Sequence, residues 1–107
     1  SRENRSQLVR VPAAMGEYRR VELRSPDSMA NPYLAFALMI QAGLYGIEEK
    51  LELPAPADIN LYQADGETLS AFRRLPQNLA VARKVAADSE FIRNCLPEGI
   101  RGCYCKG

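Results

Sequence analysis

Apolar and polar positions alternate over the first part of the chain and then give way to a long apolar run. Apolar residues surround Arg10 and Pro12 ends their run, which predicts a short strand over residues 6–11. A second strand is predicted over residues 19–23, after a connection of small residues through Gly16. The period of two in that strand directs Arg20, Glu22 and Arg24 to one face and apolar residues to the other.

A long helix is predicted next, over residues 32–51. Asn31 is a favourable N-cap, and Pro32 suits the first helical position, where its missing N–H costs nothing. The first four turns are apolar on every side, so we expect other elements to cover the helix on every side. Its apolar run, residues 33–47, is shorter than the ~20 residues of a bilayer span, which indicates a buried helix and not a membrane anchor.

The second half of the chain is predicted to be mainly helical. Two prolines end the long helix, residues 57–68 resemble an extended linker, and a helix is predicted over residues 77–87. Asp88 and Ser89 then cap a short helix that runs through Cys95.

The expected fold is therefore α+β and dominated by helix. A short antiparallel sheet portion of about two strands packs on a long buried helix, with two or more further helices. These few elements cannot enclose a helix that is apolar on all sides. Residues 1–107 are therefore predicted to be a single partial domain of a larger protein.

The composition of the chain excludes several kinds of partner and of catalytic site. The net charge of +1 gives no attraction to nucleic acid or membrane, and histidine is absent, which excludes His-based triads and the usual zinc sites. The start has no signal-peptide core and the three cysteines are an odd number, so we expect a reduced, cytoplasmic protein. Two thiolates in Cys103-Tyr104-Cys105 make a poor metal site, and the simpler interpretation is an exposed or frayed tail.

Five ordered motifs carry a family resemblance. They are NRSxxxRxP (4–12), RxExRxPD (20–27), ANPYLAFA (30–37), AGLxGI (42–47) and NLY (60–62), and together they resemble the C-terminal part of the glutamine synthetase catalytic domain. The resemblance is weaker over residues 64–96. From Pro97 onward it is absent, and the final helix of that family is not evident.

The resemblance implies an ATP-dependent ligase of nitrogen metabolism, which joins ammonia to glutamate through an acyl phosphate. It implies that Arg5 reaches the transferring phosphoryl group and glutamate, and that Arg10 and Arg20 contact ATP phosphates. It also implies that Glu22 binds Mg²⁺ or Mn²⁺ and that Arg24 holds glutamate. Guanidinium groups suit such a site because they are always charged and bind phosphate or carboxylate oxygens in pairs.

The implied partners are glutamate, ammonia and the remainder of a parent chain, which would carry most metal ligands. A large homo-oligomer is implied for the parent, and we expect this chain alone to be inactive and to associate with itself. In place of a nucleotide-contacting lysine of some relatives, the connection before Arg20 has Gly16 and Glu17. Tyr62 lies where some bacterial relatives carry a nucleotidylated tyrosine, although a loop aromatic packed on the long helix is the simpler interpretation.

Two other function classes stay open. A non-catalytic nucleotide-binding or regulatory module derived from the same family would keep the phosphate contacts without turnover. A phosphate-binding protein acting on RNA would use the same arginines, but the net charge and the lack of an aromatic and basic platform count against it. Without the motifs, the row of Arg20, Glu22 and Arg24 would be interpreted as a solvated strand face with weak ion pairs.

Overall fold

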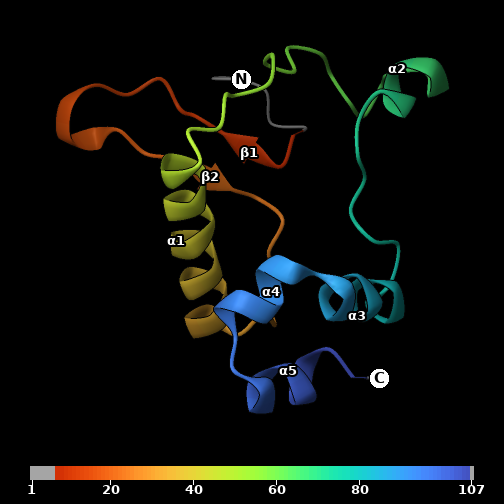
Figure 1. Ribbon diagram of the computed structural model, residues 1–107. Helices are drawn as coiled ribbons and strands as arrows, with labels where there is room; N and C mark the ends of the chain where they lie inside the picture. The colour runs from red at the N-terminus through yellow and green to blue at the C-terminus, as the bar shows by residue number, and fades with distance from the viewer. Residues whose placement is uncertain (1–6, 107) are drawn as a thin grey trace. The chain divides into compact units, whose positions relative to one another are not determined.

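The computed structural model describes residues 7–106, whose contacts divide the chain into two units, Ser1–Phe72 and Arg73–Gly107 (Figure 1). The first unit contains two strands, a 3₁₀ turn and two helices: β1 (Val9–Arg10), the turn (Gly16–Tyr18), β2 (Glu22–Leu23), α1 (Pro32–Glu48) and α2 (Gly66–Ser70). The second contains α3 (Leu79–Asp88), α4 (Glu90–Cys95) and α5 (Glu98–Tyr104). The described residues thus confirm a helix-dominated α+β chain with a two-stranded sheet.

The two strands form an antiparallel hairpin in the predicted place, but they are shorter than predicted. Arg10 pairs with Glu22, and Val9 pairs with Leu23. One further backbone bond, from the Arg24 N–H to the Leu8 carbonyl at 2.7 Å, continues the pairing past the strand ends. Among residues 7–106 no third strand supports the outer edges of these two, and a sheet of two strands is marginal on its own.

Gly16 enables the turn between the strands. Its φ is +61°, in the left-handed region that side chains with a Cβ rarely adopt. The 3₁₀ turn that it starts is closed by the Arg19 N–H, which donates to the Gly16 carbonyl at 3.3 Å. The chain therefore reverses direction over a few residues, as a hairpin requires.

α1 begins where the sequence predicts. The side chain of Asn31 accepts hydrogen bonds from the backbone N–H groups of Tyr33 at 3.0 Å and Leu34 at 3.4 Å. These N–H groups belong to the first turn and have no partner within the helix, so the cap satisfies them. Pro32 stands at the first helical position, as predicted.

The end of α1 differs from the prediction. The helix stops at Glu48 because Lys50 adopts a left-handed φ of 50°. The Leu51 N–H then donates to the Gly46 carbonyl at 3.0 Å, and the Lys50 N–H donates to the Ile47 carbonyl at 3.2 Å. This Schellman arrangement satisfies the last carbonyls, which are the groups that an ending helix leaves unpaired.

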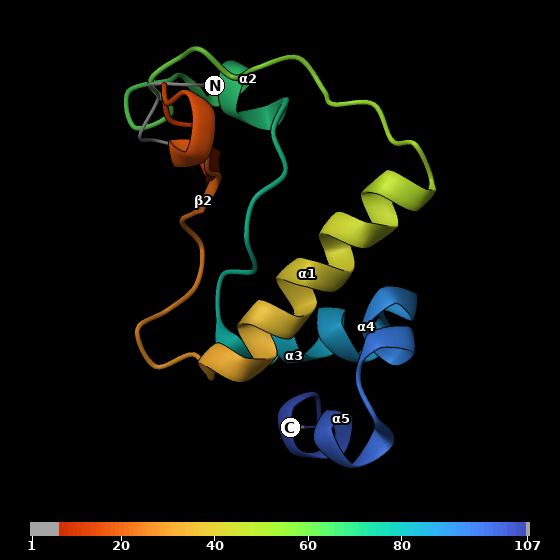
Figure 2. The same cartoon turned by 90° about the vertical axis from the view of Figure 1, so that its left-hand side faces the viewer.

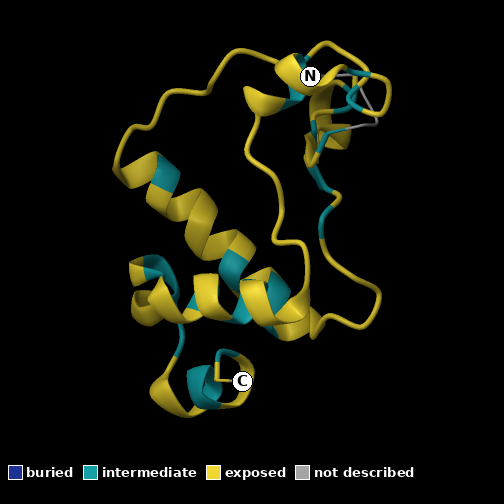
Figure 3. Ribbon diagram, turned by 90° about the vertical axis from the view of Figure 1, so that its right-hand side faces the viewer, coloured by how far each residue is buried: buried dark blue, intermediate teal, exposed yellow. Residues whose placement is uncertain are grey.

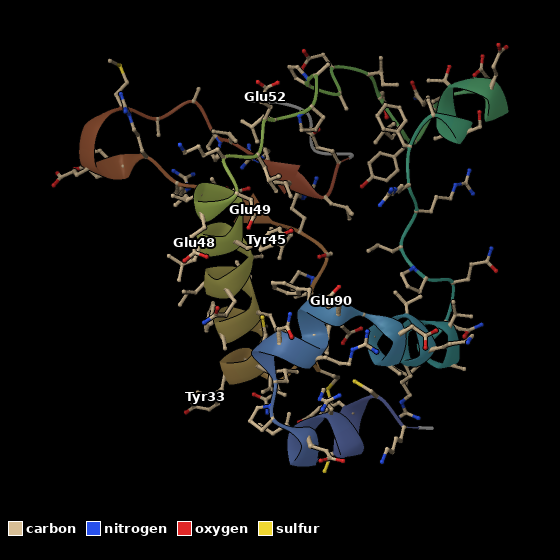
Figure 4. All side chains as sticks on the ribbon, in the orientation of Figure 1. Tyr33, Tyr45, Glu48, Glu49, Glu52 and Glu90 are labelled. Atoms are coloured by element: carbon tan, nitrogen blue, oxygen red, sulfur yellow. The ribbon has the colours of Figure 1, made fainter. Side chains whose placement is uncertain are left out.

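The expectation that α1 is buried is wrong for this chain. No described residue is buried, and most of α1, which Figure 2 shows as one uninterrupted helix, is exposed (Figure 3). Tyr33 is 84% exposed and Ile47 is 74% exposed, at opposite ends of a helix whose only charged residue is Glu48. Figure 4 shows Tyr33 at the start of α1 and Glu48 and Glu49 at its end. The shortage of covering elements, which the sequence predicts, is therefore present in the structure.

No helix within residues 7–106 combines the length and the apolar character of a membrane-spanning segment.

The predicted linker over residues 57–68 is only partly extended. Its last residues enter α2 because Asp65 caps that helix, accepting a hydrogen bond from the Thr68 N–H at 2.7 Å. The Thr68 side chain, as the larger cause, and this backbone bond hold the pKa of the Asp65 carboxyl below its ordinary value, since both stabilise the ionised form. Asn60 accepts a hydrogen bond from the Tyr62 N–H at 3.0 Å, which forms a turn in the NLY motif.

The second unit confirms two predicted helices and adds a third. Asn78 caps α3 by accepting from the Val81 N–H at 3.0 Å, and Ser89 caps α4 by accepting from the Ile92 N–H at 3.3 Å. The tail is not frayed, because residues 98–104 form α5, which contacts α4. Cys103 and Tyr104 are exposed, as expected for the tail. Two glycines, Gly99 and Gly102, lower the helix propensity of this segment, so its sequence did not predict a helix.

Candidate functional site

A bidentate ion pair joins the two strands of the hairpin. The Arg10 Nε donates to Glu22 Oε2 at 2.8 Å, and the Arg10 Nη2 donates to Glu22 Oε1 at 2.8 Å. The antiparallel register explains this contact, since it places the two residues directly opposite each other. The side chains are 21% and 33% exposed, so solvent screens this pair less than a fully exposed one.

The other predicted strand residues lie beside this pair. Arg20 Nη2 is 3.5 Å from Glu22 Oε1, and its side chain is 56% exposed, so it makes the looser of the two contacts to the carboxylate. Arg24 is two residues beyond Glu22, and the register therefore places it on the same face of the hairpin. Arg24 is exposed and forms no ion pair with the residues in the range 7–106.

Four of the five predicted site residues thus belong to one hairpin, with three guanidinium groups and one carboxylate. The fifth, Arg5, lies outside the described residues. The shared face of Arg20 and Glu22 agrees with the predicted alternation. The predicted single rigid strand is not present, because Arg20 precedes β2 and Arg24 follows it.

The sequence interpretation missed the pairing of Arg10 with Glu22. It assigned the two residues separately, one to a phosphate and one to a metal ion. A signal was available: Gly16 is equally far along the chain from Arg10 and Glu22, and a glycine midway between two strands indicates a hairpin that brings such positions together.

The guanidinium groups change the ionisation of Glu22. The hydrogen bonds from Arg10 are the largest cause that holds the pKa of the Glu22 carboxyl below its ordinary 4.5, and the charges of Arg10 and Arg20 act in the same direction. Partial burial raises the pKa, but its effect is smaller than the combined effect of the arginines. The carboxylate is therefore ionised throughout the neutral range.

This shift predicts that acid weakens the hairpin. Because the pKa is lower in the folded hairpin than in the unfolded chain, the pair stabilises the fold fully above the unfolded value of 4.5. The stabilisation is lost as the pH falls through the lower, folded value. NMR chemical shifts of the hairpin, followed in the whole chain from about pH 6 to about pH 2, measure this loss. Arg10→Gln is expected to return the Glu22 titration toward its ordinary range, and an unchanged titration in that variant would contradict the assigned cause.

A divalent cation fits Glu22 only in part. Carboxylate oxygen is the ligand type that Mg²⁺ prefers, so Glu22 can supply one ligand. Among residues 7–106, however, no group of three or more acidic, cysteine or histidine side chains could hold a metal ion, and both Glu22 oxygens already accept hydrogen bonds from Arg10. Further ligands must come from other segments if a cation binds here.

The two other candidates from the sequence have different outcomes. Tyr62 is 79% exposed, so the expectation that it packs on α1 is wrong; its modification stays a prediction. Cys103 lies in α5 and Cys105 directly follows that helix, and both are free thiols.

Comparison with known proteins places these residues in a family. The family model for the glutamine synthetase catalytic domain matches residues 1–107. A glutamine synthetase from Staphylococcus epidermidis is 45% identical over 98 residues, covering 90% of this chain and 22% of that protein. One from Methanosarcina mazei is 40% identical over 106 residues, covering 97% of this chain and 24% of that protein. The chain therefore spans about a quarter of the length of the curated relatives that it matches.

Proposed function

The chain belongs to the glutamine synthetase family, and from this premise we propose that it contributes part of the active site of an ATP-dependent ligase that joins ammonia to glutamate. Within that reaction, it supplies cationic groups for ATP phosphates and for the glutamate carboxylate. The observation that carries the proposal is the cluster of Arg10, Arg20 and Arg24 with Glu22 on one hairpin. In the parent protein the remaining cation ligands come from other segments.

The proposed role of the arginines is electrostatic. Phosphoryl transfer spreads negative charge over phosphate oxygens, and guanidinium groups held in place before the reaction stabilise that charge without reorganising. Arg10 and Arg20 take this role toward ATP. Both have at least one guanidinium nitrogen within 3.5 Å of Glu22, so they are held close to each other as well.

In this proposal, Arg24 binds a carboxylate of the glutamate substrate. It is exposed on the same hairpin face and forms no ion pair with the described residues, so its guanidinium is available for a carboxylate. A guanidinium grips a carboxylate through two parallel hydrogen bonds, which orients the substrate as well as attracting it. Arg5, by the family resemblance, contacts the transferring phosphoryl group and glutamate.

Glu22 is proposed to supply one oxygen ligand to Mg²⁺ or Mn²⁺. When bound, such a cation neutralises charge on the phosphates. The depressed pKa of Glu22 suits this role, because a ligand carboxylate must be ionised before a cation arrives.

The direct test is an assay of the full-length protein that contains this chain. Glutamine formation and phosphate release are measured with ATP, Mg²⁺, glutamate and ammonia, omitting one component at a time. The proposal expects both products to require all four components. Saturable ATP binding without any turnover would instead favour a non-catalytic module of the same family, and RNA binding that falls steeply with salt would favour the nucleic-acid alternative.

The chain of residues 1–107 alone is expected to be inactive and to self-associate. Its described residues supply one carboxylate, Glu22, at the proposed site, too few for a cation in ATP chemistry. The exposed apolar side chains of α1 and the unpaired edges of the hairpin favour contact with a second copy. Light scattering across a concentration series and the assay above measure the two properties. A strictly monomeric chain would contradict the association argument, and glutamine formation by this chain would contradict the ligand argument.

A further inference from the structure

Charge is unevenly distributed along the chain, although the net charge is only +1. Residues 48–67, called the acidic segment below, contain six carboxylates and one lysine, a net charge of −5. Residues 73–88, called the basic region, contain four arginines and lysines and one carboxylate, a net charge of +3. The chain thus has two oppositely charged regions that the proposed active site does not use.

The acidic segment has no cationic partner among the described residues. All six of its carboxylates are exposed, and none forms an ion pair within residues 7–106. Figure 4 shows Glu48 and Glu49 at the end of α1 and Glu52 in the segment that follows. The helix dipole is negative at this end, and the last turn of α1 contains no basic residue. A cationic partner would therefore relieve an unfavourable arrangement of like charges.

The basic region combines exposed cations with exposed apolar side chains. Arg73 and Arg74 are exposed and form no ion pair within residues 7–106, and Lys84 forms only an exposed ion pair inside α3. On α3, Val81 and Val85 are 45% and 57% exposed, and they lie one helical turn apart. This side of α3 and the loop before it thus present both charge and apolar surface to a partner.

We propose that the basic region docks the acidic segment of a second copy of this chain. The acidic segment matches the basic region in both properties, because Leu51 and Leu53 are 61% and 94% exposed among its carboxylates. Opposite charges attract and orient the two copies, and contact then removes the apolar side chains from water. The inference is independent of the proposed ligase reaction and adds a specific interface to the expected self-association.

An interface of this kind is head to tail, because its two surfaces are different. Each docked pair leaves one acidic segment and one basic region free, so association continues beyond the dimer unless a ring closes. Salt should weaken it, since ions screen exposed charges. Contact through the apolar side chains of α1 alone would not weaken with salt.

The test measures self-association of the chain of residues 1–107 by analytical ultracentrifugation at about 50 mM and about 500 mM NaCl. One variant, Glu48→Lys with Glu49→Lys, reverses two charges of the acidic segment. Cations suit the C-terminal end of a helix, so this change does not weaken α1. The other variant, Arg73→Glu with Arg74→Glu, reverses two charges in a loop outside the helices. Circular dichroism checks the helix content of both.

The control variant is Glu17→Lys with Asp27→Lys. It changes the net charge as much as the first variant does, at two exposed carboxylates outside both charged regions. Its association should stay within about twofold of that of the unmodified chain, because the interface is intact.

The dissociation constant of the unmodified chain should rise about tenfold from the low to the high salt concentration. At low salt, each of the two interface variants should associate about tenfold more weakly than the unmodified chain. An equimolar mixture of these two variants should restore association to within about twofold, because the original basic region of one then meets the original acidic segment of the other.

Several outcomes would overturn the interface. Association that does not weaken with salt would do so on the unmodified chain alone, even if a variant lost its helices. A mixture that associates no better than its two components would show that the two regions are not partners. A control variant that weakens as much as the first variant would show that net charge governs association. A strictly monomeric chain would overturn the interface and leave the ligase proposal to its own assay.

Discussion

Glu22→Gln in the full-length protein is expected to lower turnover on the order of 100-fold, with the hairpin still formed. The amide keeps the shape of the side chain but loses the negative charge that the proposed cation needs, and a cation contributes several kcal/mol of charge stabilisation to such a reaction. Glutamine formation at a series of Mg²⁺ concentrations measures the loss. The half-saturating Mg²⁺ concentration should rise in the same experiment.

Glu17→Gln is the matched control for this change. Glu17 is an exposed carboxylate on the turn of the same hairpin and contacts neither Arg10 nor Arg20 through an ion pair in the described structure. It should keep ordinary turnover. If Glu22→Gln also keeps ordinary turnover at saturating Mg²⁺, Glu22 is not a ligand of the cation.

Arg24→Lys should raise the KM for glutamate about tenfold and leave the KM for ATP nearly unchanged. A lysine ammonium keeps the positive charge, but it cannot reproduce the planar, two-donor contact with a carboxylate, and the lost hydrogen bond to a charged group is of this size. Steady-state kinetics with each substrate varied in turn separates the two constants.

Arg74→Lys is the control, because it makes the same chemical change at an exposed arginine that lies outside the hairpin. Both KM values of this variant should stay at their original levels. A rise in the KM for ATP with a constant KM for glutamate, in Arg24→Lys, would mean that Arg24 serves the nucleotide and that the assignments along the hairpin are wrong.

Local signals in the sequence predicted the helix starts well. Asn31 and Ser89 cap the helices that were predicted to follow them, and each does so through a backbone N–H at most three residues away. A hydrogen bond over so short a span depends on residue type and local backbone alone. The expected N-cap therefore appears even though the described residues form no buried core.

The element ends and the last helix were harder to predict. α1 ends through the left-handed conformation of Lys50, a residue type that rarely adopts it, so the sequence offers no signal comparable to glycine. α5 contains two glycines and forms where its contacts with α4 support it. At α5, contacts between helices outweigh the local propensity, whereas at the end of α1 local backbone hydrogen bonds accompany a conformation that Lys50 rarely adopts.

For the candidate site, too, some features follow from the sequence and others only from the tertiary structure. The sequence alone determined which residue types are present, namely the alternating Arg20, Glu22 and Arg24, because a period of two follows from strand geometry. It also determined that α1 is too apolar for this chain to cover. Only the tertiary structure decided that Arg10 binds Glu22, because that contact joins residues 12 positions apart and depends on the turn at Gly16 and the hairpin register. A shift of one residue in that register would turn the two side chains to opposite faces and remove the ion pair.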